Sequence, residues 1–273
     1  MTFGEKLAKA RKNAGMTQED LAAESEVSFQ AVSTWERDEN LPDVRHLTRL
    51  AEILDLSVDA LLSSDIDRSW EYDPYPFDAE RMYTYVKAKA QEAELTQTLM
   101  ALPVMREKHE GQYRSPRQAK IPYRTHPLTL ACHALAMGIR DDDIIAAALL
   151  HDVVEDTNTD PEDLPVGDRV KKTVRLVSYN TYQGEKASIK PAYYAGIKAD
   201  THASLIKCLD RCDNLSMMAC GFPRKKMAEY VNETEKYILP LLSVIKNVPG
   251  WNDAAWLLRY QMLTLLETFK RLL

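Results

Sequence analysis

Residues 149–157 place chemically reactive side chains inside an almost wholly apolar segment. The segment reads Leu-Leu-His-Asp-Val-Val-Glu-Asp-Thr, so one histidine and three carboxylates fall within six residues. A helix at a protein surface separates its polar and apolar faces, whereas this one is apolar on most sides and is predicted to be buried. Buried carboxylates are costly unless they are paired or bound to a cation. At helical spacing Asp152, Glu155 and Asp156 share one face, with His151 beside them, which predicts a divalent-metal site.

Composition restricts the class of protein. A chain of 273 residues can form one large domain or two of moderate size, and 45% hydrophobic with 28% charged residues is typical of globular proteins. No apolar run approaches the roughly 20 residues that cross a bilayer, and no signal-peptide pattern opens the sequence, so we expect a cytoplasmic protein without a membrane partner. The cysteines lack zinc-ligand or disulfide-framework spacing, and we expect reduced thiols at Cys132, Cys208, Cys212 and Cys220.

Residues 1–65 predict five short helices. The first runs from Phe3 to Asn13, and Thr17 followed three residues later by Asp20 is typical of a capping box that opens the second. The third, fourth and fifth helices are expected to begin at Ser28, at Pro42-Asp43 and at Ser57. Two helices joined by a tight turn indicate a helix-turn-helix.

Particular residues strengthen that interpretation. Met16-Thr17-Gln18-Glu19-Asp20-Leu21-Ala22, followed by Val27-Ser28 and Val32-Ser33-Thr34-Trp35-Glu36-Arg37, resembles the Cro/repressor (XRE-type) helix-turn-helix. The resemblance implies a small lambda-repressor-like domain, a double-stranded DNA partner, a homodimer and a recognition helix from Ser28 to Arg37 in the major groove. It assigns base contacts to Phe29, Gln30 and Thr34, and phosphate contacts to Gln18, Ser28 and Arg37, with possible additions from Lys6, Lys9, Arg11 and Lys12.

The same segment departs from that family in two ways. Glu26 stands in the turn and Asp38 stands after Trp-Glu-Arg, where the family usually has glycine. Residues 1–65 also carry seven Lys/Arg against thirteen Asp/Glu, which opposes attraction to phosphate. A helix-turn-helix kept for dimerisation or protein contact is therefore the alternative to DNA binding.

The rest of the chain divides into a linker and a second domain. Residues 66–77 hold two prolines, several aromatic residues and no helical period, which predicts a linker. Residues 78–273 show no convincing strand alternation, so we expect an all-α fold throughout. The expected helices are 78–109, with a possible break at Pro103, then 127–137, 142–155, 166–179, 203–219, 225–247 and 253–272. The polar and aromatic segment 179–201 is either a flexible lid or an ordinary surface connection.

Two further segments bring polar groups into apolar surroundings. His126 stands just before a helix expected to begin at Pro127, so its ring would be rigidly held. Lys207, Asp210 and Asn214 fall on one face of another apolar helix. The combination of His126, His151, Asp152 and Asp210 is a mixed nitrogen and oxygen set, which suits Mn²⁺, Fe²⁺ or Zn²⁺ better than Mg²⁺.

These residues carry a second resemblance. The run from Leu149 to Thr157 resembles the HD phosphohydrolases, and among them the hydrolase domain of RelA/SpoT-type alarmone enzymes, over residues 108–240. Gln112-Tyr113-Arg114, Pro122-Tyr123 with His126-Pro127, and Lys207 with Asp210-Arg211 and Asn214 follow in the family's order. By position the resemblance implies metal ligands, usually for Mn²⁺, at His126, His151, Asp152 and Asp210, a catalytic pair Glu155 and Asp156, and nucleotide contacts from Arg114, Lys207 and Asn214. The implied reaction is release of pyrophosphate from the 3′-diphosphate of guanosine tetra- or pentaphosphate.

Departures from that family leave the substrate open. Ser115 and a longer insert follow Arg114, which makes Arg117 a rival to Arg114, and Ser216 with Met217 stand where the family has other residues. The alternatives are a transcription regulator whose HD domain binds a nucleotide without turnover, and an HD phosphohydrolase of another nucleotide. The intact Glu155-Asp156 pair favours catalysis, since a sensor has no need of a general acid or base.

Overall fold

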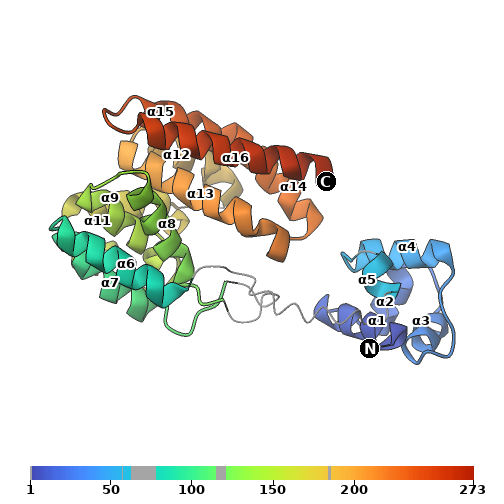
Figure 1. Cartoon of the computed structure of the whole chain (residues 1–273). Coiled ribbons are helices and arrows are strands. Elements are labelled where there is room, and N and C mark those ends of the chain that lie inside the picture. The colour runs from blue at the N-terminus through green and yellow to red at the C-terminus, as the bar shows by residue number, and fades with distance from the viewer. Residues whose placement is uncertain (1, 57, 63–77, 115–120, 184–185) are drawn as a thin grey trace. The chain divides into compact units, whose positions relative to one another are not determined.

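The computed structural model describes residues 2–56, 58–62, 78–114, 121–183 and 186–273. Over these residues the chain is all-α, and one isolated bridge pairs Tyr113 with Pro122. Two compact units lie within residues 1–73 and 74–273, each with its own hydrophobic core (Figure 1). Among the described helices none is both long enough and apolar enough to cross a bilayer. The linker expected at 66–77 lies outside the described residues.

The first unit contains the five expected helices. They are α1 (Phe3–Asn13), α2 (Gln18–Glu24), α3 (Phe29–Glu36), α4 (Val44–Ile53) and α5 (Val58–Leu62). Thr17 and Asp20 form the predicted capping box, and Ser28 and Asp43 cap the next two helices. These side chains accept hydrogen bonds from backbone N–H groups that the first helical turn leaves unpaired. The cap expected at Ser57 lies outside the described residues.

The start of α1 is fastened to the end of α3. Gly4 packs so closely that a Cβ atom there would lie 2.5 Å from the Glu36 carbonyl oxygen. The Asp38 carboxylate accepts a 2.7 Å hydrogen bond from the Gly4 N–H and another from the Thr2 hydroxyl. Asp38 has a φ of 57°, so this residue joins the two helices from a left-handed backbone conformation.

The second unit consists of two packed layers of helices. Its first elements are α6 (Ala79–Glu92), α7 (Thr96–Lys108), α8 (Thr125–Ala136), α9 (Asp142–Leu150), α10 (Val153–Asp156), the 3₁₀ turn Pro161–Asp163 and α11 (Asp168–Val177). The later ones are the 3₁₀ turn Tyr179–Thr181, α12 (Lys186–Lys198), α13 (Thr201–Gly221), α14 (Arg224–Glu233), a π-helical turn Thr234–Ile238, a 3₁₀ turn Leu239–Leu241, α15 (Leu242–Lys246) and α16 (Asn252–Leu272). The α13 helix contacts α8, α9, α11 and α12 as well as α15 and α16, so it links the layers (Figure 1).

Several expected helix boundaries were wrong. The 78–109 segment is interrupted at Glu94, which has a φ of 55°, whereas α7 continues through Pro103. Segment 225–247 is divided by the π-helical and 3₁₀ turns. Segment 179–201 is mostly the helix α12, in which Tyr193 is fully buried, so the flexible-lid interpretation was wrong.

The buried helix predicted around Leu149 is present but shorter than expected. Every residue of α9 from Ile144 to Leu150 is fully buried, and the helix ends where the polar pair His151-Asp152 begins. Asp142 anchors its other end, because its carboxylate accepts hydrogen bonds from the backbone N–H groups of Gln97 and Thr98 at the start of α7. Since α7 has no side-chain cap of its own, Asp142 caps it from another helix.

Candidate metal centre and helix-turn-helix surface

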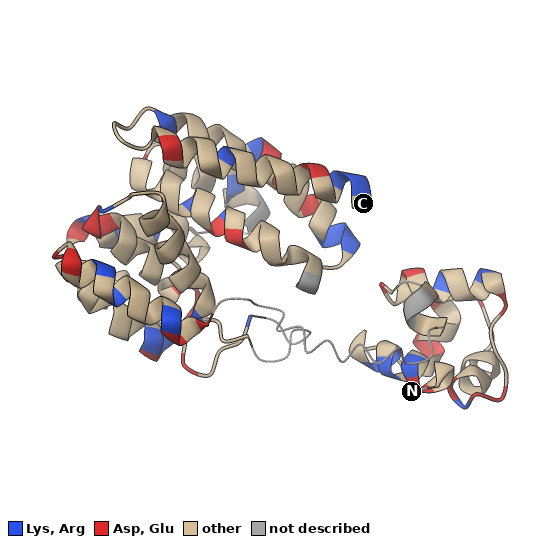
Figure 2. Ribbon diagram, viewed as in Figure 1, with Lys and Arg blue, Asp and Glu red and all other residues tan. Residues whose placement is uncertain are grey.

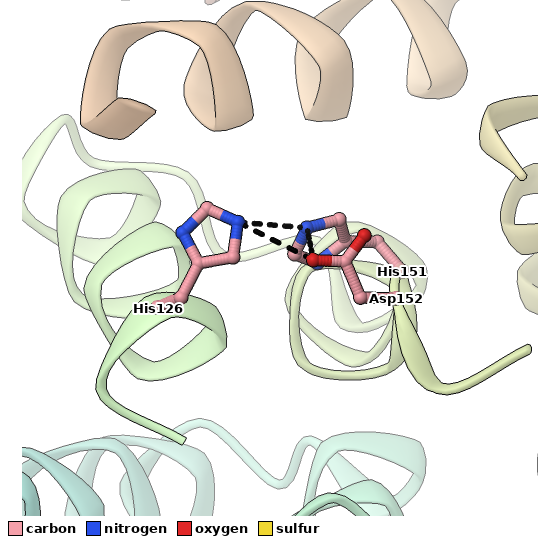
Figure 3. Close-up of side chains that lie close together, drawn as sticks. All are labelled: His126, His151 and Asp152. Carbon is pink, nitrogen blue, oxygen red and sulfur yellow. Dashed lines mark hydrogen bonds and ion pairs between the residues drawn. The ribbon is translucent and has the colours of Figure 1, made fainter. Parts of the chain in front are cut away.

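Three segments carry the four predicted metal ligands: donor atoms of His126, His151 and Asp152 all lie within 4.8 Å of one another, and Asp210 lies beside His126. His126 is the second residue of α8, rather than preceding the helix as expected, His151 and Asp152 lie between α9 and α10, and Asp210 lies on α13. Figure 3 shows His126 and the His151-Asp152 pair facing one another. The His126 Nε2 atom lies 3.2 Å from His151 Nε2, 3.4 Å from Asp152 Oδ2 and 3.3 Å from Asp210 Oδ1. His151 Nε2 lies 3.0 Å from Asp152 Oδ2.

The two imidazoles are held so that both direct a lone pair inward. His151 Nδ1 lies 2.9 Å from the Ala148 carbonyl oxygen, and His126 Nδ1 lies 2.6 Å from Asp213 Oδ2. A ring that donates through Nδ1 presents an unprotonated Nε2. Two such Nε2 atoms 3.2 Å apart, beside carboxylate oxygens, repel one another unless a positive charge lies between them. This donor set therefore fits a divalent cation, with both histidines oriented from behind as metal ligands usually are.

The pKa shifts show how strongly the centre favours positive charge. Burial alone would lower the pKa of His126, but Asp152, Asp210 and Asp213 raise it well above its usual value. Burial would raise the pKa of Asp152, yet His151 and His126 lower it well below the ordinary range. The centre thus contains carboxylates whose negative charge stabilises a cation or a proton at the same place.

Arg114 and Asn214 lie behind the ligands. The Arg114 guanidinium forms an ion pair with Asp213, 2.8 Å from Nη1 to Oδ2, and donates a 3.0 Å hydrogen bond to the Asn214 side-chain oxygen. Asn214 in turn donates to Asp210. Both residues were predicted to contact a nucleotide, and in the structure their side chains form a hydrogen-bond layer around His126 and Asp210.

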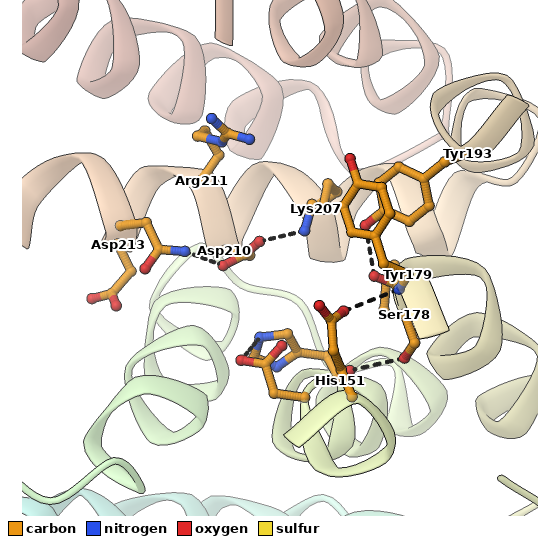
Figure 4. A network of polar contacts seen from close by, with 12 residues as sticks. His151, Ser178, Tyr179, Tyr193, Lys207, Asp210, Arg211 and Asp213 are labelled. Carbon is orange, nitrogen blue, oxygen red and sulfur yellow. Dashed lines mark hydrogen bonds and ion pairs between the residues drawn. The ribbon is translucent and has the colours of Figure 1, made fainter. Parts of the chain in front are cut away.

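Lys207 faces the same centre from α13. Its ammonium group lies 2.8 Å from Asp210 Oδ2 and above the ring of Tyr193 (Figure 4). Burial would lower the pKa of Lys207, but Asp210 raises it well above the usual value, so the group stays charged. Asp210 therefore faces Lys207 with one oxygen and His126 with the other.

The expected acid–base pair lies on one turn beside the centre. Glu155 accepts a 3.0 Å hydrogen bond from the Tyr179 N–H, which fixes the carboxylate near the start of the 3₁₀ turn (Figure 4). Burial raises the pKa of Asp156, and the neighbouring charge of Asp152 raises it further. Asp156 can therefore hold a proton at a pH where an ordinary aspartate has lost it.

Sequence reasoning missed Asp213, and it named Tyr123 only as part of the Pro122-Tyr123 motif, without a role of its own. Asp213 orients His126, Tyr123 donates a 2.6 Å hydrogen bond to Asp152 Oδ2, and His109 packs against the Tyr123 ring. Asp213 could have been found, because it stands three residues after Asp210 and so lies on nearly the same face of the helix. No comparable periodicity points to Tyr123, which lies between two helices.

In the first unit the two helices of the motif, α2 and α3, are packed together. Val32 and Trp35 point inward, while Phe29 and Gln30 are exposed on the opposite side of α3. Thr34 is half-buried and donates its hydroxyl hydrogen to the Ala31 carbonyl oxygen. The expected base-contacting residues thus share the outer side of the helix, with Thr34 the least accessible of them.

Several side chains expected to contact phosphate instead form ion pairs or hydrogen bonds with acidic side chains of the same unit. Glu36 binds the guanidinium of Arg11, 2.6 Å from Nε to Oε1, and accepts a 2.6 Å hydrogen bond from Gln18. Arg37 pairs with Glu39 at 2.7 Å, and the loop after α3 is rich in acidic residues (Figure 2). Ser28 is used as the cap of α3. Arg11 is buried, so its suggested contribution to phosphate binding was wrong.

The second unit has relatives of known activity. The chain is 30% identical over 148 residues to the guanosine-3′,5′-bis(diphosphate) 3′-pyrophosphohydrolase MESH1 of Drosophila melanogaster, which covers 53% of this chain and 80% of that protein. The chain belongs to this pyrophosphohydrolase family. An enzyme of the same name from Aquifex aeolicus is 31% identical over 169 residues, 60% of this chain and 23% of that protein. The chain thus spans about a quarter of the length of the bacterial relative.

A solved structure agrees with the family's fold. It is described as a metazoan ortholog of SpoT that hydrolyzes ppGpp, and it superposes with a TM-score of 0.52 at 24% identity, covering 63% of this chain and 95% of that one. At that identity the likeness concerns the fold alone. Residues 7–61 match the helix-turn-helix family model, which confirms the expected class of the first unit.

Proposed function

We propose that the second unit hydrolyses the 3′-diphosphate of guanosine tetra- or pentaphosphate and releases pyrophosphate. The observation that carries the proposal is the pair of inward-facing Nε2 atoms beside two carboxylate oxygens, in a chain of the pyrophosphohydrolase family. His126, His151, Asp152 and Asp210 would hold the metal, and a mixed nitrogen and oxygen set suits Mn²⁺ well. When bound, such an ion lowers the pKa of a water molecule and polarises a phosphoryl oxygen.

The protein side chains supply the remaining chemistry. Water attacks the phosphorus attached to the 3′-oxygen, the bond to that oxygen breaks, and the 3′-oxygen takes up a proton. Asp156, whose pKa is raised, would hold the proton that the leaving oxygen needs, and Glu155, fixed by the Tyr179 N–H, would orient the attacking water. Lys207 offsets negative charge on the substrate. Arg114 and Asn214 act by positioning His126 and Asp210.

A pyrophosphate-release assay tests the activity. The purified protein is incubated with Mn²⁺ and guanosine tetraphosphate, and Asp152→Ala is compared with Glu229→Ala, which alters an exposed residue of α14. We expect release by the wild type and by Glu229→Ala, and loss of at least about a hundredfold in Asp152→Ala, since a metal ligand is removed. Tight nucleotide binding without release would instead identify a sensor. Turnover of another nucleotide alone would identify a different HD phosphohydrolase.

For the first unit we propose double-stranded DNA binding through α3, by a homodimer that reads two half-sites in the cytoplasm. Phe29 and Gln30, which are exposed, would contact bases together with Thr34. Gln18, Ser28 and Arg37 would contact phosphates. For this Gln18 must leave Glu36, and Arg37 must leave Glu39. The match of residues 7–61 to the helix-turn-helix family supports this.

DNA binding is tested by fluorescence anisotropy with the region upstream of the gene. Gln30→Ala combined with Arg37→Ala should weaken binding, and loss of the Arg37 phosphate contact should reduce the salt slope by about one. Arg45→Ala, on the exposed start of α4, is the control and should bind like the wild type. Absence of binding at low salt, or equal binding by the double variant, would identify the head as a protein-contact module.

A further inference from the structure

The outer face of α16 carries a continuous stripe of exposed side chains. The buried side of this helix is formed by Ala254, Ala255, Leu258, Met262, Leu266 and Phe269, which pack on the rest of the unit. At 100° per residue the opposite side presents Asp253, Trp256, Leu257, Tyr260, Thr264, Glu267, Thr268 and Arg271, here called the α16 stripe. The positions 253, 257, 260, 264, 267 and 271 are spaced 4-3-4-3-4, the spacing of a helix that packs against another helix.

The first half of the α16 stripe is aromatic and accessible. Trp256 is 62% exposed and Tyr260 is 59% exposed, and their rings are stacked in parallel with centroids 5.5 Å apart. Exposed aromatic surface of this kind is enriched at protein interfaces. Leu257 adds an aliphatic group beside them.

The second half of the α16 stripe is a shallow depression. Leu263, Thr264, Glu267, Thr268 and Arg271 line it, and four of these residues have the i, i+3, i+4, i+7 spacing of the hole that receives a side chain from a facing helix. The hydroxyls of Thr264 and Thr268 already donate to carbonyl oxygens of their own helix. Covering them therefore leaves no hydroxyl hydrogen unpaired.

We propose that α16 pairs with α16 of a second copy of this chain in antiparallel orientation. We place the two-fold axis level with Met262 along the helix. Each residue then lies opposite the residue of the second copy whose number makes the sum 524. Trp256 then enters the depression at Thr268 of the second copy, and Tyr260 lies against Thr264. Asp253 at the start of the helix then faces Arg271 at its end, whose guanidinium lies 3.8 Å from Glu267 of its own helix, and the Asp253–Arg271 pair is complementary in charge.

The homodimer proposed above for DNA binding has no contact surface assigned, and this inference assigns one. It stands on the α16 face alone and holds whether or not the chain hydrolyses a nucleotide or binds DNA. A second copy is the occupant that the stripe fits, since one half of it supplies the aromatic side chains and the other half supplies the depression for them. Because an isologous contact uses the same surface on both copies, it closes as a dimer, and no third copy can bind through that surface.

Sedimentation velocity of the full chain tests the proposal. We expect the wild type to be a dimer at micromolar concentration. Asp253→Arg or Arg271→Asp alone should each weaken self-association by about tenfold or more, because each brings like charges together across the axis. The double variant Asp253→Arg/Arg271→Asp restores opposite charges only in the antiparallel register, so it should dimerise like the wild type.

Two further variants make the test decisive. Trp256→Glu removes the ring that fills the depression and should give a monomer, whereas Arg259→Asp reverses a charge on the same helix outside the stripe and should leave the dimer intact. Circular dichroism checks that each variant is folded. A monomeric wild type at about 100 µM, a dimer unaffected by Trp256→Glu, or a double charge reversal that fails to restore association would each overturn the proposal.

Discussion

At the scale of single residues, Glu26 adopts a backbone conformation that suits glycine better. It is exposed in the turn between α2 and α3, with a φ of 57°. A left-handed conformation costs an ordinary L-residue roughly 1–2 kcal/mol. Glycine avoids this cost, but it loses more conformational entropy on folding, so only part of the difference appears as added stability. Glu26→Gly should therefore raise the free energy of unfolding of the head by about 0.5–1 kcal/mol in urea denaturation.

Two comparisons check that reasoning. Gly15 has a φ of 72°, so Gly15→Ala should destabilise the head, with the opposite sign. Asp38 has the same φ as Glu26, but Asp38→Gly removes the hydrogen bonds to Gly4 and Thr2 and should bring no gain. If Glu26→Gly and Asp38→Gly change stability equally, the backbone conformation is not what distinguishes these positions.

Asp213 is predicted to act through His126. Asp213→Asn keeps the shape of the side chain but removes the charge that holds His126 with Nδ1 protonated and Nε2 free. Loss of such a partner typically lowers metal affinity 10- to 100-fold, and we expect about that change in Mn²⁺ titration calorimetry. Asp168→Asn, at the exposed start of α11, should bind Mn²⁺ as the wild type does. Unchanged affinity in Asp213→Asn would show that His126 needs no orienting carboxylate.

At the scale of elements, the π-helical turn after α14 lies beside a partly buried ion network. Arg211 on α13 is bound by Glu233 at 2.5 Å and stacks on the ring of Tyr230, while Lys190 from α12 reaches the same carboxylate. Burial would raise the pKa of Glu233, but Arg211 and Lys190 lower it to about 2 from 4.5. The network thus ties three helices together through one carboxylate.

The pH dependence of stability follows from that shift. Because the pKa of Glu233 is lower in the folded state, its stabilisation is present above pH 4.5 and is lost as the pH falls toward 2. Glu233→Gln should cost about 1–2 kcal/mol at pH 7, allowing for water that still reaches the carboxylate, and the gap to the wild type should narrow at pH 3. Urea unfolding without added metal measures it. The control Glu235→Gln changes a carboxylate that pairs with Lys270 and not with Arg211, so its difference in stability from the wild type should not follow the titration of Glu233. A difference for Glu233→Gln that stays the same at pH 7 and pH 3 would contradict the linkage.

The helix boundaries show which elements can be predicted from the sequence. Thr17, Ser28 and Asp43 carry their own capping chemistry, so the starts of α2, α3 and α4 were predicted correctly. The interruption at Glu94 carries no local signal, because glutamate seldom adopts a positive φ. Tyr193 is buried by neighbouring elements of the second unit, and tertiary packing of that kind made α12 invisible to a search for local periodicity.

The candidate metal ligands could be named from the sequence, but the side chains that lie behind them could not. A histidine-aspartate pair inside an apolar helix indicates a partner of opposite charge, so His151 and Asp152 could be named as candidate metal ligands. Which groups lie behind them depends on how α8 and α13 pack. The resemblance assigned Arg114 to the nucleotide, and its pairing with Asp213 could not be read from the sequence.

At the scale of the whole molecule, two separate cores predict two separate unfolding events. The head core includes Leu7, Leu21 and Leu50, and the second core surrounds α9 and α13, with no residue shared. A metal that binds only the second unit can raise the melting temperature of that unit alone. At a Mn²⁺ concentration of about 100 times Kd the gain is about 2.7 kcal/mol, or roughly 5–10 °C.

Differential scanning calorimetry with and without Mn²⁺ measures this effect. The transition of the head should stay in place, and in Asp210→Asn the Mn²⁺-dependent shift of the second unit should disappear because a ligand is lost. A single transition that moves as a whole would mean that the two units unfold cooperatively.

The junction of Thr2 and Gly4 with Asp38 has a practical consequence for handling the protein. Since the first turn of α1 is hydrogen-bonded to the residue that follows α3, an addition ahead of Thr2 can disturb the end of the helix expected to read DNA. Purification tags and fluorescent labels at that end can thus alter apparent sequence preference without touching one exposed side chain of α3. Measurements of binding should be made after such additions have been cleaved.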